Sequence, residues 1–247
     1  MLRQKEIIND WAWDVLIVLD ACRFDFFEKH ALPVLPKGEL YKAWSEGSCT
    51  PEWFLKTFTR DYYDWVYVSG NPFISSYPVK VEGLDFADKV YAGGRFYKVV
   101  NAHDIGWSKV NNVYTVKPSV VTSLARVTLK TIRGKRIIVH YLQPHAPYVF
   151  IPQLRRYWKA DKTKMCINLW DALRKKEVDV NLVIEGYKRN LLWVLGYVRK
   201  LLEDTRGKRV IITSDHGEAF GEWFTFNHPP GAKVPVLREV PVYVIQP

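Results

Sequence analysis

The fold is decided by the run Val210-Ile211-Ile212-Thr213-Ser214-Asp215-His216-Gly217-Glu218. Its first half is apolar and β-branched and is bounded by Gly207 and Gly217, a pattern typical of a short buried strand. At its carboxyl end the strand presents a carboxylate and an imidazole, Asp215 and His216, next to each other in the sequence. Because open α/β sheets hold their active sites at the carboxyl ends of strands, this run predicts both a sheet and a site.

A second buried strand ends in the same way. Residues 14–20 include the apolar run Val15-Leu16-Ile17-Val18-Leu19 and end on Asp20. Two buried strands that lie far apart in the chain, and that each end on a potential metal ligand, predict a metal site built across a sheet.

Strands and helices alternate along the rest of the chain. Apolar patterns predict further strands at 40–44, 65–69, 136–141 and 240–245, and helices at 23–30, 50–58, 119–132 and 184–202. In the second helix Thr50 can act as the N-cap, with Pro51 at the first helical position. The alternation predicts an α/β fold, a three-layer α/β/α sandwich with a mostly parallel central sheet. We expect one domain over residues 1–247, with irregular insertions at 71–118 and 150–180.

The composition fits a compact protein with a basic surface. The 247 residues carry a formal net charge of +10, and 48% of them are apolar. This content allows a large core and argues against a disordered chain. The basic surface can attract an anionic substrate or an anionic lipid face. No recognised nucleic-acid module is visible, so nucleic acid is not an expected partner.

The cysteines and the N-terminus bear on the location of the protein. Cys22, Cys49 and Cys166 are widely spaced, and no secretory signal follows Met1, which indicates reduced thiols and a cytoplasmic location. The sequence has no run of about 18 apolar residues, so no transmembrane helix is expected. It leaves peripheral membrane association and the oligomeric state open.

Several polar residues at predicted strand ends converge on one site. They are Asp20, the turn Ser48-Cys49-Thr50, His145, the pair Asp215-His216 and, further on, His228. Carboxylate and imidazole ligands together suit zinc or manganese. A hydroxyl at the start of a helix would complete the shell, where free backbone N–H groups favour an anionic substrate. Because a metal-bound hydroxyl ionises more readily, the pattern indicates nucleophilic chemistry.

Five blocks of sequence carry a family resemblance. They are Leu19-Asp20-Ala21-Cys22-Arg23-Phe24-Asp25, Thr50-Pro51, His140-Tyr141-Leu142-Gln143-Pro144-His145-Ala146-Pro147-Tyr148, Ser214-Asp215-His216-Gly217-Glu218 with Gly221-Glu222, and Arg238-Glu239-Val240-Pro241-Val242. In order and spacing the chain resembles the alkaline phosphatase superfamily, which includes arylsulfatases, nucleotide pyrophosphatases and phosphoglycerol transferases. It looks closest to sulfatase-like proteins of archaeal type. The resemblance implies an α/β/α sandwich and a metal-assisted attack on a phosphate or sulfate ester.

The resemblance also implies the roles of the metal ligands. Asp20, Asp215 and His216 would bind a divalent ion, manganese or zinc, and Thr50 would be both a ligand and the nucleophile. His228 would be a further ligand.

Other residues would act on the substrate. His145 or His228 would protonate the leaving group, and Arg23 would clamp a phosphoryl oxygen. Gln143 stands where two-metal relatives might carry an aspartate, and an amide is a poorer ligand, so one ion is favoured. A second ion at His145 and His228 is left open.

Three neighbouring residues compete for the role of nucleophile. Thr50 ranks first, because Thr50-Pro51 resembles the start of the motif in phosphodiesterase-like relatives. Ser48 ranks second and Cys49 third. Cys49-Thr50-Pro51 also resembles the sulfatase motif, whose cysteine becomes formylglycine, but Trp53 stands where that motif requires arginine.

The sequence therefore predicts a metal-dependent hydrolase or transferase acting on a phosphate ester, a phosphodiester or phosphoglycerol-type group, through a threonine nucleophile. Two alternatives remain: a sulfatase-like sulfuric ester hydrolase, and an inactive protein that binds an anionic glycan or lipid head group. The substrate would be a small, glycan-linked or lipid-linked anionic ester. His30, His103 and His140 are given no role in this prediction.

Overall fold

The computed structural model describes residues 1–78, 90–158 and 168–247. Its centre is an eight-stranded sheet in the order β1-β3-β12-β9-β2-β8-β4-β5. The strands are β1 (Leu2–Arg3), β2 (Val15–Asp20), β3 (Glu39–Trp44), β4 (Tyr62–Ser69), β5 (Phe96–Asn101), β8 (Arg136–Pro144), β9 (Val210–Thr213) and β12 (Glu239–Ile245). Of these, β12 runs antiparallel to both its neighbours, and the other pairs are parallel, which confirms the mostly parallel sheet.

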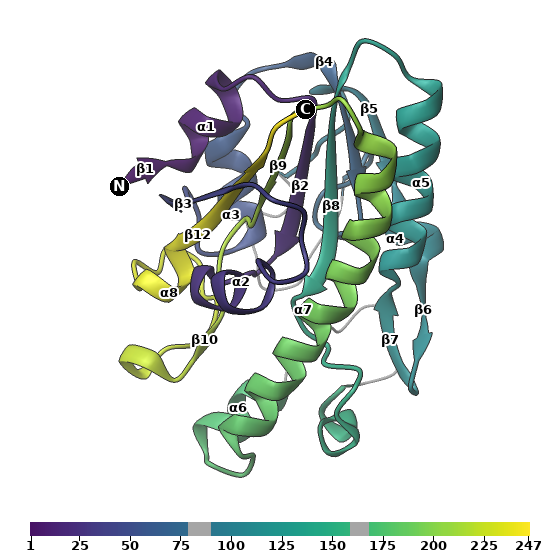
Figure 1. The fold of residues 1–247 in the computed structure, drawn as a ribbon. Coiled ribbons are helices and arrows are strands. Elements are labelled where there is room, and N and C mark those ends of the chain that lie inside the picture. The colour runs from purple at the N-terminus through teal and green to yellow at the C-terminus, as the bar shows by residue number, and fades with distance from the viewer. Residues whose placement is uncertain (79–89, 159–167) are drawn as a thin grey trace.

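Helices cover both faces of the sheet (Figure 1). One face is covered by α2 (Phe24–His30), α5 (Pro118–Thr131) and α7 (Val180–Leu202), and the other by α1 (Gln4–Asp10) and α3 (Thr50–Thr57). The shorter helices are α4 (Ala102–Gly106), α6 (Asn168–Arg174) and α8 (Pro235–Arg238). The three-layer α/β/α sandwich is confirmed.

The alternation of side chains along β2 explains the layers. Val15, Ile17 and Leu19 face the α7 side, while Leu16 and Val18 face the side of α1 and α3. All five are fully buried, as expected for a central strand covered on both faces.

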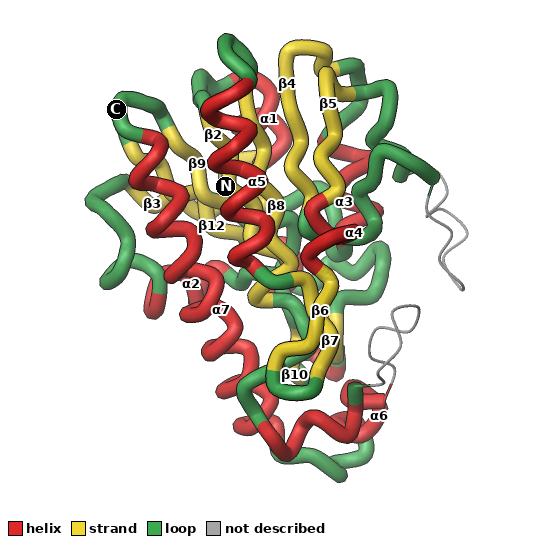
Figure 2. The backbone as a smooth tube through the Cα atoms, turned by 90° about the vertical axis from the view of Figure 1, so that its right-hand side faces the viewer, coloured by secondary structure: helices red, strands yellow, loops and turns green. Residues whose placement is uncertain are grey.

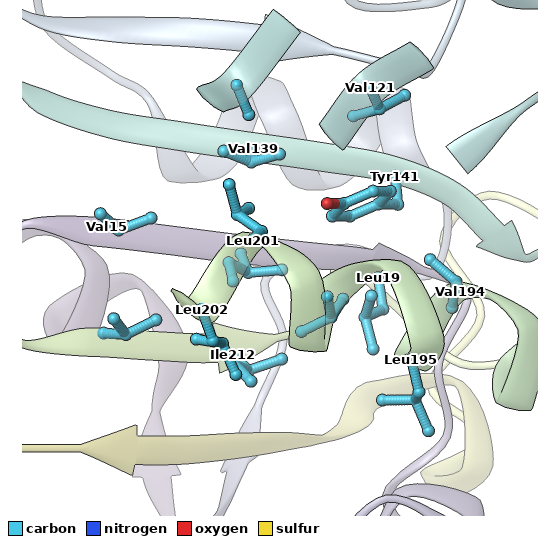
Figure 3. Packing of buried hydrophobic residues seen from close by; sticks show 14 of the residues in the cluster. Val15, Leu19, Val121, Val139, Tyr141, Val194, Leu195, Leu201, Leu202 and Ile212 are labelled. Atoms are coloured by element: carbon cyan, nitrogen blue, oxygen red, sulfur yellow. The ribbon is translucent and has the colours of Figure 1, made fainter. Parts of the chain in front are cut away.

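The core on the α7 side is closely packed. Figure 3 shows Val15 and Ile212 of the sheet beside Leu201 and Leu202 of α7. Full burial of a side chain of this size contributes about 1.5–3 kcal/mol, so α7 is held mainly by burial of its apolar face.

The first turns of α3 and α7 differ from the prediction. Cys49 is the N-cap residue of α3. Thr50, which was predicted to be the N-cap, is instead the first residue of the helix. Helix α7 starts at Val180 rather than 184, because the side chain of Asp179 accepts a hydrogen bond from Asn181 N at 2.9 Å.

The segment 71–118, expected as an insertion or irregular edge, contributes to the sheet. Residues 96–101 form the edge strand β5, which pairs with β4, and a hairpin of β6 (Trp107–Val110) and β7 (Val113–Val116) follows. In the segment 150–180, a 3-10 helix (Pro152–Tyr157) and α6 join a separate core cluster with α7. Figure 2 shows the β6–β7 hairpin and α6 extending beyond the same end of the sheet. Residues 79–89 and 159–167 of these segments, with the basic run 159–164 and Cys166, lie outside the described residues.

A second hairpin, β10 (Ala219–Phe220) with β11 (Phe226–Asn227), follows the motif at the end of β9. Among the described helices none is long and apolar enough to cross a membrane.

Candidate active site

The register of the parallel strands brings the predicted strand ends together. Val18 of β2 pairs with Thr213 of β9 on one side and with His140 of β8 on the other. Asp20 and Asp215 lie two residues beyond this row, so both carboxylates leave the sheet at the same place. Both are fully buried.

Thr50 faces these carboxylates from the first turn of α3. Its Oγ1 donates a hydrogen bond to Asp215 Oδ2 at 2.7 Å and lies 3.4 Å from His216 Nε2. Asn71 Nδ2 donates to Thr50 Oγ1 at 3.1 Å and to Asp20 Oδ2 at 2.5 Å. The hydroxyl is therefore fixed between two carboxylates and an imidazole at the amino end of a helix, where an anion is favoured.

Neighbouring backbone groups orient two of the predicted ligands. His216 Nδ1 lies 2.8 Å from Gly217 O, which leaves Nε2 turned toward Asp20 Oδ1 at 3.6 Å and Asp215 Oδ2 at 3.3 Å. Asp215 Oδ1 accepts from the amides of Ala21 (3.0 Å) and His216 (2.9 Å), which leaves Oδ2 for Thr50. Such supporting hydrogen bonds commonly fix metal ligands.

The donor set fits a cation. Ligand atoms of Asp20, His140 and Asp215 lie within 4.8 Å of one another. Asp20 Oδ1 and His140 Nε2 are buried and have no hydrogen-bond partner among the described residues. Burial, and then the charge of Asp215, raise the pKa of Asp20 well above its usual range. A divalent ion would relieve the repulsion between the two buried carboxylates, because its positive charge compensates both at once.

The second carboxylate of the pair stays ionised more readily. Burial alone would raise the pKa of Asp215, but the imidazoles of His216 and His140 and the hydrogen bonds from Thr50 and Ala21 lower it.

A second group of potential ligands lies beside the first. Ligand atoms of His145, Glu218 and His228 lie within 4.8 Å of one another, with His228 Nδ1 3.0 Å from Glu218 Oε1. The ring of His228 is 4.5 Å from that of His216. Burial raises the pKa of Glu218 to about 7 and lowers those of His145 and His228 to about 4. Both imidazoles are thus neutral near pH 7 and able to accept a metal ion.

A cleft of about 160 Å³ opens onto both groups. Its lining includes Asp20, Thr50, His145 and His228. A larger cleft of about 750 Å³, lined in part by Pro33, Arg199 and Lys208, lies at the opposite ends of the strands and includes none of these residues.

The two alternative nucleophiles have other surroundings. Ser48 Oγ donates to Pro229 O at 2.7 Å and lies 3.0 Å from Glu52 Oε2, which ties it to the adjacent loop. Cys49 lines the cleft, but burial raises the pKa of its thiol to about 12, so the nucleophilic thiolate is disfavoured. Trp53, at the position of the sulfatase arginine, is fully buried and donates to Gln4 Oε1 at 2.8 Å.

The guanidinium of Arg23 is bound by acidic side chains. Its guanidinium donates to both oxygens of Asp25 at 3.0 and 2.8 Å and to Glu222 Oε1 at 2.5 Å. Through Glu222 the guanidinium of Arg23 is tied to the loop after Glu218, and its role as a phosphoryl clamp stays a prediction.

Three residues that sequence reasoning gave no role contribute to the site. His140 is anchored through Nδ1 to Tyr67 Oη at 2.8 Å and turns Nε2 toward Asp215 Oδ2 at 3.8 Å. Asn71 bridges Asp20 and Thr50, and Glu218 completes the second group. The side-chain amide of Gln143, by contrast, donates to Thr115 Oγ1 and Val116 O.

The signals for these residues were weak but present. Glu218 stands inside the decisive motif, and Asn71 lies two positions after the end of the predicted strand 65–69.

Comparison with solved structures identifies the fold. A scan of protein-family profiles finds no match, and no curated protein matches by sequence. The soluble domain of lipooligosaccharide phosphoethanolamine transferase A from Neisseria meningitidis superposes with a TM-score of 0.60 at 15% identity, over 93% of this chain and 75% of that one. The periplasmic domain of EptC from Escherichia coli, in complex with Zn, superposes with a TM-score of 0.57 at 11% identity, over 96% of this chain and 74% of that one. A 2-O GAG sulfatase superposes with a TM-score of 0.57 at 12% identity, over 94% of this chain and 64% of that one.

The chain therefore has the alkaline phosphatase-like fold of these transferases and sulfatases. At such low identity the likeness concerns the fold, and the chemistry has to be argued from the site itself.

Proposed function

We propose that the protein is a metal-dependent transferase or hydrolase that acts on a phosphate ester through Thr50. The observation that carries the proposal is the placement of Thr50 Oγ1, 2.7 Å from Asp215 Oδ2 and 3.4 Å from His216 Nε2, at the amino end of α3. A nucleophile, a proton acceptor and an anion-binding helix start are thus adjacent.

The residues proposed to hold the ion are Asp20, Asp215, His216 and Thr50, with His140 close by. When bound, a divalent ion would lower the pKa of the threonine hydroxyl and offset negative charge on the phosphoryl group. Zinc and manganese both suit these donors, and the EptC structure is a complex with Zn.

The proposed reaction has two steps. Thr50 Oγ1 gives its proton to Asp215 Oδ2 and forms a bond to phosphorus, while the bond from phosphorus to the leaving alcohol breaks. His145 or His228 passes a proton to that alcohol. Because both imidazoles are neutral near pH 7, the proton comes from Glu218, whose pKa is about 7 and whose Oε1 lies 3.0 Å from His228 Nδ1. Water or a second alcohol then attacks the phosphothreonine and gives its proton to the histidine and glutamate group that supplied one in the first step. The bond between phosphorus and Thr50 breaks, and Thr50 Oγ1 takes back the proton held by Asp215 Oδ2, which restores the hydroxyl.

A second ion would occupy the group of His145, Glu218 and His228. Glu218 supplies there the carboxylate that Gln143 does not. One ion with free histidines would leave them as proton donors, whereas two ions would favour hydrolysis by a metal-bound nucleophile.

We propose a lipid-linked or glycan-linked anionic ester as the substrate class. The similar transferases are named for phosphoethanolamine and lipooligosaccharide, and the similar sulfatase for a GAG. Part of the cleft lining is apolar, with Phe73 and Leu142, which fits a substrate with a non-polar portion.

The test compares two ester classes on one protein. Bis(p-nitrophenyl) phosphate and p-nitrophenyl sulfate are offered with added zinc or manganese, for the parent and for Thr50→Ala. Turnover of the phosphodiester that Thr50→Ala abolishes supports the proposal. Turnover of the sulfate ester alone, with formylglycine at Cys49 by mass spectrometry, would establish the sulfatase reading instead. Binding of phosphate esters without any turnover would establish an inactive binding protein.

A further inference from the structure

The hairpin of β10 and β11 carries two aromatic side chains into solvent. Trp223 is 62% exposed and Phe224 is 99% exposed, at the tip between the two strands. An isolated exposed aromatic residue needs no explanation, but two adjacent ones at the tip of a hairpin form an apolar projection.

The backbone holds this projection in an unfavourable conformation. Trp223 and Phe224 have φ values of 49° and 56°, in the left-handed region that bulky residues avoid. Three backbone hydrogen bonds close the tip: Phe224 N to Gly221 O (3.1 Å), Thr225 N to Glu222 O (2.9 Å) and Gly221 N to Thr225 O (2.9 Å). Glu222 is fixed in turn by Arg23. A strained conformation that the surroundings maintain is a frequent sign of function.

The base of the hairpin is part of the candidate active site. Glu218 precedes β10 and His228 follows β11, and their side chains lie 3.0 Å apart. Figure 1 shows β10 at the end of the sheet where β2 and β8 finish. The aromatic tip and the mouth of the catalytic cleft therefore belong to the same end of the molecule.

A basic segment flanks the hairpin. Helix α6 packs on it through Trp170, stacked on Phe220, and through Arg174, whose guanidinium lies 5.7 Å from the ring of Phe226. Arg174 is followed by Lys175 and Lys176, and all three are exposed. Exposed aromatics beside exposed cations match the interface of an anionic bilayer, where tryptophan favours the headgroup region and each lysine or arginine adds attraction.

We propose that Trp223 and Phe224 insert into an anionic lipid surface and seat the cleft against it. Binding to the lipid surface does not depend on the ester chemistry. The proposal rests on the proposed function only where it states that this binding brings a lipid-linked ester to Thr50.

The experiment is co-sedimentation of the full chain with vesicles of phosphatidylcholine alone or mixed with phosphatidylglycerol. The parent is expected to bind the mixed vesicles, and added salt is expected to weaken that binding. Trp223→Ser combined with Phe224→Ser is expected to lower the affinity by about tenfold or more. Lys175→Glu with Lys176→Glu is expected to remove the preference for phosphatidylglycerol.

A matched control uses two aromatics at the amino ends of β4 and β5. Tyr63 and Tyr97 are 61% and 56% exposed, and Tyr63→Ser with Tyr97→Ser is expected to bind vesicles as the parent does. No vesicle binding by the parent, or equal binding by the Trp223 and Phe224 variant, would overturn the proposal. So would a parent dimer in sedimentation velocity that this variant dissociates, because the tip would then contact a second copy.

Thr50→Ala separates the two proposals. It is expected to bind vesicles like the parent, since Thr50 lies inside the cleft. Vesicle binding without any ester turnover by the parent would leave the docking intact and refute the proposed chemistry.

Discussion

Thr50 Oγ1 and Asp215 Oδ2 are joined by a hydrogen bond of 2.7 Å between residues 165 positions apart in the chain. The contact connects the first turn of α3 to the carboxyl end of β9, so the nucleophile and its proton acceptor are fixed by two separate elements. Thr50→Ala is expected to lower kcat for a phosphodiester by at least about a thousandfold, because the attacking atom is lost. Steady-state turnover of bis(p-nitrophenyl) phosphate is the measurement.

Two control variants make this prediction specific. Thr50→Ser keeps a hydroxyl and is expected to retain measurable turnover and to yield a phosphorylated peptide on rapid quench. Ser48→Ala is expected to keep most of the activity, because the Ser48 hydroxyl binds Pro229 O and Glu52 and not the carboxylates of Asp20 and Asp215. Full turnover by Thr50→Ala would show that another group attacks phosphorus.

The metal content follows from the buried carboxylates. Protein purified without chelator is expected to hold about one divalent ion per chain, and Asp215→Ala to lose it, because Asp20, His216 and Thr50 would then offer a single carboxylate. Chelation is expected to lower the Tm, because it leaves Asp20 beside Asp215 without compensation. Elemental analysis and thermal unfolding measure both effects.

Glu218→Gln distinguishes one ion from two. If the parent holds two ions, this variant is expected to hold one, because the carboxylate between His145 and His228 is lost. A parent that takes up no ion even with added zinc or manganese would contradict the catalytic proposal.

Much of the site was predictable because strand ends are local signals. The runs that end on Asp20 and Asp215 are apolar and contiguous, and parallel strands present their carboxyl ends at one edge. The edge strand β5 was missed for the opposite reason, since it is partly exposed, with Tyr97 and Lys98 outward, and lacks a continuous apolar run.

The positions of His140 and Arg23 depend on contacts between segments that lie far apart in the sequence. The register of β8 against β2 places His140 opposite Val18, two residues before Asp20, and strand periodicity alone does not reveal this pairing. Arg23 was expected to face substrate because it follows Asp20. Its partner Glu222 lies 199 positions away and reaches it only when the chain after β9 folds back.

A glycine in the decisive motif allows two backbones to touch. A Cβ on Gly217 would lie 1.9 Å from Val236 O, and Gly217 N donates to Leu237 O at 2.9 Å. Gly217→Ala is therefore expected to cost about 2 kcal/mol or more of unfolding free energy, since backbone rather than a mobile side chain must shift. Urea unfolding measures it.

Gly196 of α7 is the matched control for this change. A Cβ there would meet none of the described atoms within 4 Å. Gly196→Ala is expected to stabilise the protein by about 0.5–1 kcal/mol, because alanine is the better helix former. Similar destabilisation by both variants would contradict the role given to the contact at Val236.

A buried histidine outside the site predicts one component of the pH dependence of stability. His103 is 7% exposed, and its Nε2 has no hydrogen-bond partner among the described residues. Burial lowers the pKa of His103, an effect that Asp104 opposes only in part. The unfolded chain, with a histidine pKa of about 6.5, therefore binds this proton more readily, so stability falls as the pH drops below about 6.5 toward the folded-state pKa.

His103→Gln is expected to give a shallower decline of unfolding free energy between about pH 7 and pH 5 than the parent, and urea unfolding across that range in chelator-free buffer would measure it. Parallel curves for the two proteins would show that His103 titrates alike in the folded and unfolded states.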